Sequence, residues 1–301
     1  MSQLKSALLA DRGVIGVSGP DALTLLQGVV TADLAALPID GAAHAGLLSP
    51  QGKILFDFFV VRRDADDLLI ETARASVVGL VQRLSMYKLR ARVQIEDRSK
   101  DFSVFAMWGQ TPSWPAATGP RPVLVQDPRL PALGCRALLT LETDFLPHVS
   151  GADPVSHERY EAHRIGLGVP EAGRDFELGD TFPHEALYDQ TGTVSFTKGC
   201  YVGQEVVSRM QHRGTARKRV VMVRASSPLP ASGTPIRAGA ATIGTLGSTQ
   251  DTDGLALLRT DRAAEALSKG EPVTAGDLAL HLSVPPFATF KLEPPAAGDP
   301  A

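Results

Sequence analysis

The order of the predicted elements in the first third of the chain constrains the fold more than any other feature of the sequence. Apolar strands over 45–48 and 53–61 flank the turn sequence Ser-Pro-Gln-Gly and predict a hairpin. A strand over 68–72, a helix over 77–88 with apolar residues at helical spacing, and a strand over 93–97 follow. Strand, strand, helix and strand in such close succession are typical of an α+β fold rather than of a doubly wound parallel sheet.

Glycine and proline, at 28 and 22 residues, divide the rest of the chain into short elements. A strand over 13–19 leads into an amphipathic helix, and another helix is predicted over 154–167. The proline-rich region 110–135 is predicted to be a surface loop. Beyond a break at 226–233, short strands recur between glycines, which predicts a small antiparallel barrel.

Charge and cysteine content exclude several functional classes. With 30 Lys and Arg against 33 Asp and Glu, the net charge is −3, so the surface as a whole is not built for nucleic acid. The two cysteines, Cys135 and Cys200, cannot form a disulfide framework or a complete zinc or iron–sulfur site. No apolar run approaches the roughly 20 residues of a membrane helix, and the start does not look like a signal peptide. We therefore expect a cytoplasmic protein without a permanently bound metal.

The densest group of chemically useful residues surrounds Cys200. Gly199 and Gly203 bracket the cysteine, and a helical pattern follows, which would place the thiol at or just before a helix N-terminus. With Lys198 beside it, such a position favours the thiolate, so Cys200 can be a nucleophile, a redox group or a transient metal ligand. The alternative is a small buried side chain that packs the start of the helix.

Three other features are candidates for binding. Asp57 lies within an apolar strand, where it either faces water, as alternation favours, or occupies a pocket that shifts its pKa. Glu185 offers a second carboxylate upstream of Cys200. The basic run 212–219 can hold a phosphate, a polycarboxylate or RNA, or it is simply a solvated helix end. It has no interleaved aromatic residues, so we do not expect direct nucleic-acid binding.

Several short motifs together carry a family resemblance. The octapeptide Lys-Gly-Cys-Tyr-Val-Gly-Gln-Glu at 198–205 matches the signature KGCYxGQE of the YgfZ family, which includes mitochondrial iron–sulfur assembly counterparts. Further segments resemble that family's motifs over about residues 10 to 285: 21–31, 48–54, 87–90, 164–170 and 213–219.

The resemblance implies the fold of the aminomethyltransferase (T-protein) of glycine cleavage. That fold is an α+β body of two intertwined parts, closed by a C-terminal antiparallel barrel. Carried onto this sequence, it implies one α+β part over 1–45 and 150–225, which bears the octapeptide, and a second, ferredoxin-like part over 46–149. It implies a barrel over 226–290 and a disordered tail over 291–301.

The resemblance also implies a function. Its members act in folate-dependent assembly, delivery or repair of iron–sulfur clusters, especially the four-iron clusters of radical and tRNA-modifying enzymes. Tetrahydrofolate is then the cofactor, and the partners are iron–sulfur client proteins and assembly factors, with no membrane involved. The implied chemical residues are Lys198 and Cys200, the latter also as a transient metal ligand, and the rest of the motif shapes the site: Gly199, Tyr201, Gly203, Gln204 and Glu205. The implied folate contacts are Asp57, Glu185, Arg209 and Arg213.

The alternative is a tetrahydrofolate-dependent aminomethyl transferase. The catalytic aspartate of the transferases falls near Val78, which the pattern places inside the apolar stripe of a helix, and their pterin-binding glutamate falls near Gly166. Neither valine nor glycine has a side chain that accepts a proton or a hydrogen bond. The resemblance therefore favours an accessory factor over an enzyme. Cys135 is not expected to take part.

Overall fold

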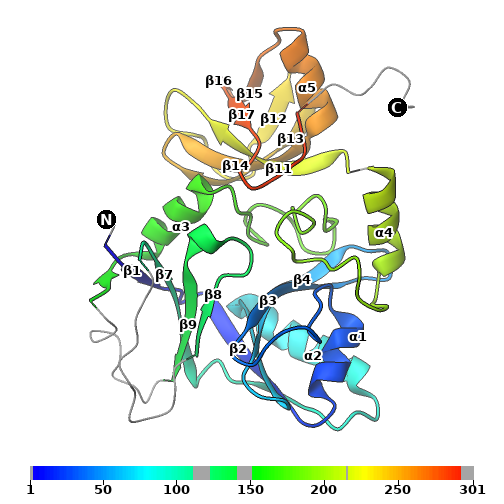
Figure 1. The fold of residues 1–301 in the computed structure, drawn as a ribbon. Helices are drawn as coiled ribbons and strands as arrows, with labels where there is room; N and C mark the ends of the chain where they lie inside the picture. The colour runs from blue at the N-terminus through cyan, green and yellow to red at the C-terminus, as the bar shows by residue number, and fades with distance from the viewer. Residues whose placement is uncertain (1–2, 111–122, 141–150, 215, 293–301) are drawn as a thin grey trace. The chain divides into compact units, whose positions relative to one another are not determined.

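The computed structural model describes residues 3–110, 123–140, 151–214 and 216–292 (Figure 1). The chain forms two compact units, Met1–Tyr160 with Thr191–Gln204, and Glu161–Gln190 with Glu205–Ala301. After Tyr160 the chain leaves the first unit, and it returns for the single segment 191–204. That segment carries most of the predicted motif.

The first unit is built on an antiparallel sheet with the strand order β3-β4-β5-β2-β6. The strands are β2 (Arg12–Ser18), β3 (Ala42–Leu48), β4 (Ile54–Arg62), β5 (Asp67–Ala73) and β6 (Gln94–Asp97). Helices α1 (Ala22–Val29) and α2 (Val77–Lys88), the latter preceded by the 3₁₀ turn η1 (Arg74–Ser76), bury apolar residues such as Leu26 and Leu84 against one face of this sheet. The predicted α+β class, the hairpin and both helices are confirmed.

The other face of this sheet is covered by a second sheet with the order β10-β1-β7-β9-β8. Its strands are β1 (Lys5–Leu8), β7 (Phe102–Trp108), β8 (Val123–Gln126), β9 (Cys135–Thr140) and β10 (Asp153–Pro154). Side chains alternate along a strand, so Val61 of β4 lies in the same core cluster as Val104 of this sheet, while Val60 belongs to the cluster on the side of the helices. The first sheet is therefore buried on both faces.

Two expectations for the first unit are wrong. The region 110–135 is not only a loop: β8 and the start of β9 lie in it, and Pro131 opens the 3₁₀ helix η2 (Pro131–Leu133) between them. Residues 111–122 of that region lie outside the described residues. Val78 is not in the apolar stripe of α2 either. Its side chain is 64% exposed because Val77, Leu80 and Leu84 form the buried face.

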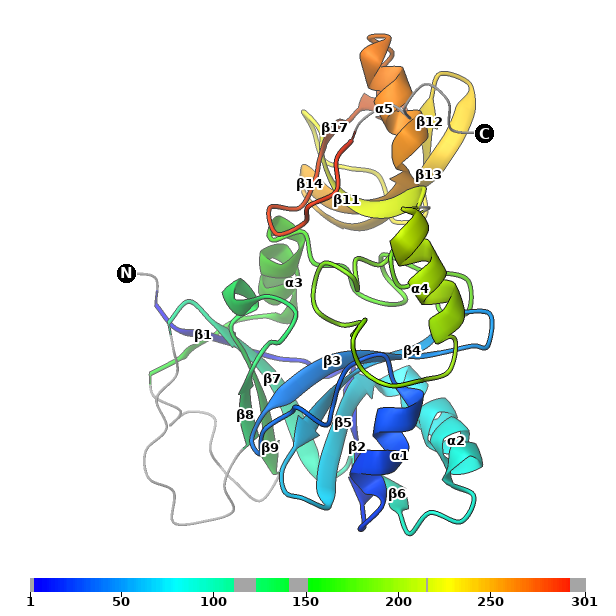
Figure 2. The ribbon, with the colours of Figure 1, turned by 45° about the vertical axis from the view of Figure 1, so that its right-hand side comes forward.

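The second unit contains a seven-stranded sheet with the order β16-β15-β12-β13-β14-β11-β17. Its strands are β11 (Lys218–Arg224), β12 (Pro235–Ala238), β13 (Ala241–Gln250), β14 (Asp253–Arg259), β15 (Val273–Ala275), β16 (Leu278–Ala279) and β17 (His281–Ser283). The outermost strands β16 and β17 are separated in the chain only by Leu280, so the sheet curls into a nearly closed barrel. Helix α5 (Thr260–Ser268) packs Ala263 and Ala266 into its core (Figure 2).

The barrel confirms the prediction of a C-terminal antiparallel barrel, and its strand β11 lies ahead of the expected start at residue 226. The predicted division of the chain into parts stays a prediction. The predicted tail 291–301 lies, from residue 293 onward, outside the described residues. Among the helices that the structure describes, none is long and apolar enough to cross a membrane.

A buried arginine organises the rest of the second unit. Arg164 of α3 (His157–Gly166) is fully buried, and its guanidinium donates to Glu161 at 2.8 Å, to Asp175 at 2.7 Å and to Ser248 of β13 at 2.8 Å. Burial opposes the charge, but the surrounding carboxylates raise the pKa of Arg164 above its usual value. A single cation thus links a helix, the loop after it and a barrel strand.

Candidate functional site

The segment 191–204 is fastened to the first unit by backbone and hydroxyl contacts at Thr31. The Thr31 hydroxyl donates to the carbonyl of Thr193 at 2.7 Å and accepts from the N–H of Gly46 at 2.8 Å. The N–H of Ser195 donates to the carbonyl of Thr31 at 2.9 Å. One threonine therefore joins the end of α1, the strand β3 and the segment that carries the motif.

Lys198 is a buried anchor of this segment. Its Nζ donates to the carbonyls of Gln27, Val30 and Ala32 at 2.7, 2.8 and 2.7 Å. These carbonyls lie at the C-terminal end of α1, where a helix leaves its last carbonyls unpaired and its dipole favours a cation. Burial lowers the pKa of Lys198 to about 8, and the nearby Asp33 opposes this only in part.

This geometry differs from the expected role of Lys198. The sequence predicts that its charge acts on the Cys200 thiol, but the ammonium donates to three carbonyls at and just beyond the C-terminal end of α1. The sequence could not show this because the acceptors lie more than 160 residues away along the chain.

The other side of the motif is held by Tyr201 and Gly203. Tyr201 is buried, and burial raises the pKa of its hydroxyl to about 12. Gly203 has a φ of +81°, and a Cβ there would lie 2.5 Å from the carbonyl oxygen of Ser49. Only glycine fits both this backbone conformation and the close contact with the Ser49 carbonyl. The motif is thus packed against the hairpin turn Ser49–Gly52, which lies within 48–54, one of the further segments that carry the family resemblance.

Cys200 lies between these anchors and is exposed. The alternative of a small buried side chain is therefore wrong. Helix α4 (Gln204–Arg213) begins four residues after Cys200. The thiol therefore precedes the first turn of the helix, where the partial positive charge of the N-terminus is strongest. The backbone around the thiol is positioned by side chains buried on either side of it, and the thiol itself faces solvent.

Asp57 is not on an exposed face. Its side chain is 10% exposed, and its carboxylate lies 3.3 Å from Nε2 of His44. The Nδ1 of the same imidazole is 2.9 Å from the hydroxyl of Thr193, which is 2.8 Å from that of Thr191. The expectation failed because alternation shows which side of a strand a residue occupies, but not that a second sheet covers that side.

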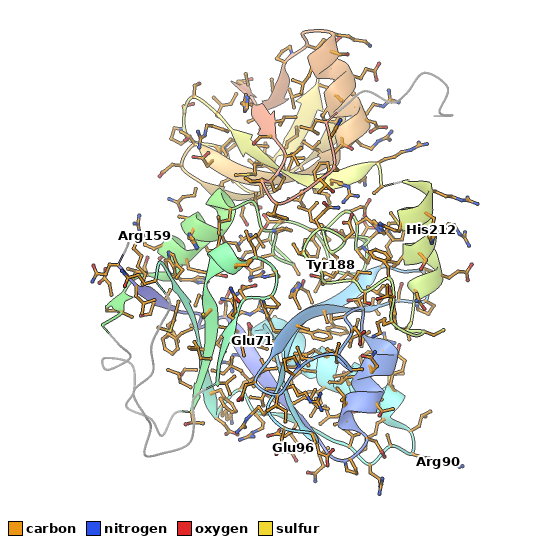
Figure 3. All side chains as sticks on the ribbon, in the orientation of Figure 1. Glu71, Arg90, Glu96, Arg159, Tyr188 and His212 are labelled. Atoms are coloured by element: carbon orange, nitrogen blue, oxygen red, sulfur yellow. The ribbon has the colours of Figure 1, made fainter. Side chains whose placement is uncertain are left out.

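A layer of buried charges lies beyond Asp57, and sequence reasoning missed it. Asp127 binds Arg129 at 2.8 Å, and Glu71 binds Arg12 and lies 3.5 Å from Arg136; Figure 3 shows Glu71 among the strands. Burial opposes the charge of the Asp127 carboxylate, yet Arg129 holds the pKa of Asp127 below its usual value. The guanidinium groups of Arg129 and Arg136 lie 4.9 and 5.1 Å from the ring of Phe59. Asp127 and Arg129 are only two residues apart, in the segment after β8, whereas Arg12, Glu71 and Arg136 come from three separate strands, so no local pattern indicates that these charges meet.

The remaining predicted residues belong to the second unit. Glu185 accepts a hydrogen bond from the N–H of Phe182 at 2.8 Å, while exposed Arg209 pairs with Glu205 at 2.6 Å. Within the described part of this unit, no hydrogen bond or ion pair joins Glu185 to Arg209 or Arg213. Of the basic run, Arg219 binds Asp189 at 2.9 Å, and Arg213, Arg217 and Lys218 are exposed. Thr215 lies outside the described residues.

Comparison of the chain with known proteins identifies its family. Residues 10–113 match the family model described as the GCVT N-terminal domain, and residues 217–290 match the CAF17 C-terminal beta-barrel domain. The human protein named "Iron-sulfur cluster assembly factor IBA57, mitochondrial" is 34% identical over 281 residues, which cover 84% of this chain and 77% of that protein. The chain belongs to the IBA57 family.

Other relatives agree with this assignment. The IBA57 homolog of Mycosarcoma maydis is 35% identical over 246 residues, and the match spans 77% of this chain but 60% of that protein. Among solved structures, the glycine cleavage system aminomethyltransferase T from Bartonella henselae has a TM-score of 0.74 at 16% identity, covering 95% of this chain and 87% of that one. At this identity the likeness shows the fold alone, and it confirms the predicted aminomethyltransferase-like fold.

Two expectations are adjusted by these relatives. The predicted YgfZ resemblance is confirmed in a coarser form: the chain belongs to the IBA57 family and has the transferase fold, and the relatives described above carry the name IBA57. The expected cytoplasmic location is wrong by the same comparison, because the IBA57 relatives are named as mitochondrial proteins.

Proposed function

We propose that this IBA57-family protein assists the assembly, delivery or repair of iron–sulfur clusters, with Cys200 as a thiolate ligand to a cluster shared transiently with a partner protein. The observation that carries the proposal is the exposed thiol on a segment fixed by Lys198 on one side and by Tyr201 and Gly203 on the other. A fixed backbone presents a ligand with little loss of conformational entropy on binding.

The number of ligands explains why a partner is needed. Iron–sulfur clusters are usually held by four cysteine thiolates. Among the residues that the structure describes, no three His, Cys, Asp or Glu side chains are grouped as a metal site would require. Cys135 is only partly exposed, and burial raises the pKa of its thiol. The partner must therefore bring the other ligands, and the cluster is cargo rather than a resident cofactor.

A complementation experiment tests the role of Cys200. In cells that lack their own IBA57-type protein, the wild-type chain should restore the activity of a four-iron enzyme. Cys200→Ser should leave that activity at the level of the deletion, since serine does not supply a thiolate. Cys135→Ser is the matched control and should restore activity fully. Equal rescue by both variants, at equal protein levels on immunoblots, would remove Cys200 from the mechanism.

We also propose that the protein binds tetrahydrofolate. The support is the GCVT-type N-terminal domain and the transferase-like fold. Three of the side chains expected to hold folate have other partners: Asp57 faces His44, Glu185 accepts from a backbone N–H, and Arg209 pairs with Glu205. We therefore assign no chemical step to folate. With Val78 and Gly166 in place of acids, we do not propose aminomethyl transfer.

Calorimetric titration with tetrahydrofolate tests this second proposal. We expect saturable binding in the micromolar range, weakened by Arg213→Gln because that exposed guanidinium is expected to bind the carboxylates of the ligand. The control is Arg224→Gln, an exposed arginine on β11. Absence of binding at millimolar tetrahydrofolate would contradict folate binding, and the Cys200 proposal would stand, because its readout does not involve folate.

A further inference from the structure

The C-terminal end of α2 exposes two apolar side chains. Met86 is 67% exposed and Leu89 is 88% exposed. Single exposed apolar residues are common on protein surfaces, so exposure alone indicates little. The backbone of Leu89 gives a second, independent observation.

Leu89 occupies a turn position that suits glycine. The N–H of Ala91 donates to the carbonyl of Lys88 at 2.7 Å and closes a β-turn in which Leu89 is the first central residue. Its φ of 43° and ψ of −105° are close to a type II′ turn, in which glycine is strongly preferred at this position. Strained residues of this kind cluster at functional sites. Since glycine would form this turn more easily, the leucine indicates a role other than forming the turn.

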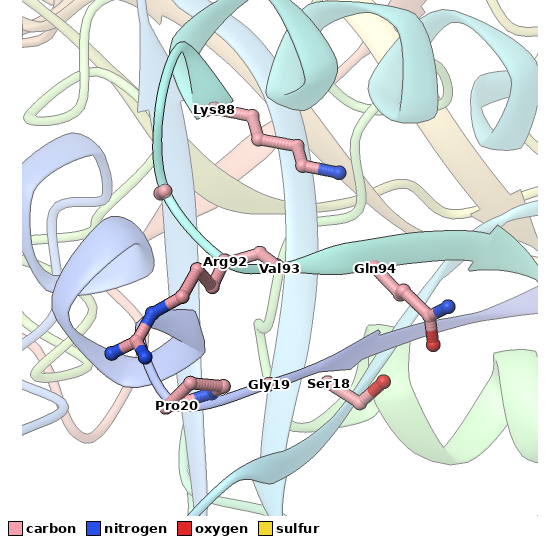
Figure 4. Close-up of a pocket in the computed structure, with 8 residues that line it drawn as sticks. Ser18, Gly19, Pro20, Lys88, Arg92, Val93 and Gln94 are labelled. Atoms are coloured by element: carbon pink, nitrogen blue, oxygen red, sulfur yellow. The ribbon is translucent and has the colours of Figure 1, made fainter.

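An open pocket of about 380 Å³ lies beside this turn. Its walls come from the end of β2 and from the residues after α2, and they include Ser18, Gly19, Lys88, Arg92 and Gln94. Figure 4 shows Lys88, Gln94 and Ser18 on one side of the pocket and the guanidinium of Arg92 on the other. Gly19, with a φ of +121°, lies so close to the carbonyl of Arg92 that a Cβ would collide with it.

The chain segment that contributes one wall of this pocket is positively charged. From Thr72 to Ile95 the sequence contains no Asp or Glu, and its basic residues are Arg74, Arg83, Lys88, Arg90 and Arg92. Arg92 lies 3.4 Å from Asp21, whose carboxylate also accepts from the Arg92 N–H. In the described part of the chain, neither Lys88 nor Arg90 takes part in an ion pair. Two cations thus flank the exposed Leu89 in the chain, and no ion pair neutralises either of them in the described residues.

We propose that the end of α2 binds an acidic segment of a partner protein. In this arrangement an apolar side chain of the partner packs against Leu89 and Met86, and its carboxylates face Lys88 and Arg90. The exposed acids Glu96 and Asp97 on the edge strand β6 limit the positive area; Figure 3 labels Arg90 and Glu96 in this part of the first unit. Such a short positive area suits a peptide better than a phosphate backbone or an anionic bilayer, which present charge continuously.

This surface is separate from the Cys200 motif. The pocket lies at the N-terminal end of α1, which begins three residues after Gly19, whereas Lys198 binds the carbonyls at the C-terminal end of that helix. A helix of this length spans about 12 Å. The inference therefore goes beyond the proposed function, and each can fail without the other.

The test uses a fluorescein-labelled peptide in which Glu and Leu alternate, titrated with the full chain at about 0.15 M salt and followed by anisotropy. We expect saturable binding, weakened roughly fivefold or more both by Leu89→Gly and by the double variant Lys88→Gln, Arg90→Gln. Lys100→Gln, on an exposed lysine elsewhere in the same unit, should bind like wild type. Leu89→Gly is informative because glycine adopts this turn conformation without strain. The thermal midpoint of the variant should therefore not fall, and weaker binding could not be attributed to unfolding.

Three outcomes would overturn the proposal. The first is no binding of the peptide by the wild-type chain at millimolar concentration. The second is equal binding by the wild-type chain and Leu89→Gly, which would leave only non-specific charge attraction. In the third, phosphatidylserine vesicles or a single-stranded RNA bind in a way that depends on Leu89, Lys88 and Arg90 while the peptide does not.

Discussion

Lys198→Met is expected to lower the free energy of unfolding by about 3 kcal/mol and to release the segment that carries Cys200. Methionine nearly matches the length of lysine but donates no hydrogen bond, so the carbonyls of Gln27, Val30 and Ala32 lose their shared donor. Each buried acceptor left without a partner costs roughly 1–3 kcal/mol, which water entering the site reduces. Urea unfolding measures the loss of stability.

Hydrogen exchange distinguishes release of the motif from general destabilisation. Amides of residues 195–203 should lose protection in Lys198→Met before those of the central strands β4 and β5. The matched control is Lys100→Met, an exposed lysine in the same unit, for which we expect a change within about 0.5 kcal/mol. If Lys198→Met is as stable as this control, the hydrogen bonds to α1 do not hold the motif.

The same residue predicts a dependence of stability on pH. The pKa of Lys198 is about 8 in the folded protein and has its usual value of 10.5 in the unfolded chain. Between these values the unfolded state binds more protons, so the free energy of unfolding should rise with pH, by up to about 1.4 kcal/mol per pH unit. Below pH 8 both states are protonated and the contribution is flat. Lys198→Met should lack the rise, and an equal slope in both proteins would contradict the lowered pKa.

Arg164→Met should destabilise the second unit by about 3–5 kcal/mol. The variant removes the only cation that binds Asp175 directly in the described structure, at 2.7 Å, and leaves that fully buried carboxylate without its charge partner. It also removes the hydrogen bond to Ser248 of β13. The expected readout is an earlier unfolding transition, together with loss of protection in β13.

A neighbouring arginine provides the control. Arg174 approaches Glu161 and Glu171 at 3.6 Å, but its side chain is 43% exposed. Exposed ion pairs are screened by water, so Arg174→Met should cost less than about 1 kcal/mol. Similar losses for the two variants would mean that burial does not set the strength of this cluster.

Local features of the first unit could be predicted because the interactions that decide them are near in sequence. The hairpin around Ser49–Gly52 follows from turn residues between apolar strands, and α2 follows from apolar residues three and four apart. The exposed side of α2 was harder to predict. Its apolar residues form a stripe wider than the face that is buried, so Val78 was predicted to be buried although it is exposed. In the proline-rich region, strong strand formers at 123–125 outweighed the prolines around them.

Sequence patterns were enough to predict the fold class, the main helices of the first unit, the barrel and the position of the cysteine motif in the chain. The nearly buried position of Asp57 beside His44, the bonds of Lys198 to the end of α1 and the exposure of Cys200 could be seen only once the chain was folded. The difference lies in the range of the interactions. Periodicity and turn chemistry act over a few residues, whereas burial of a charge and the choice of its partner depend on which distant strand or helix covers it.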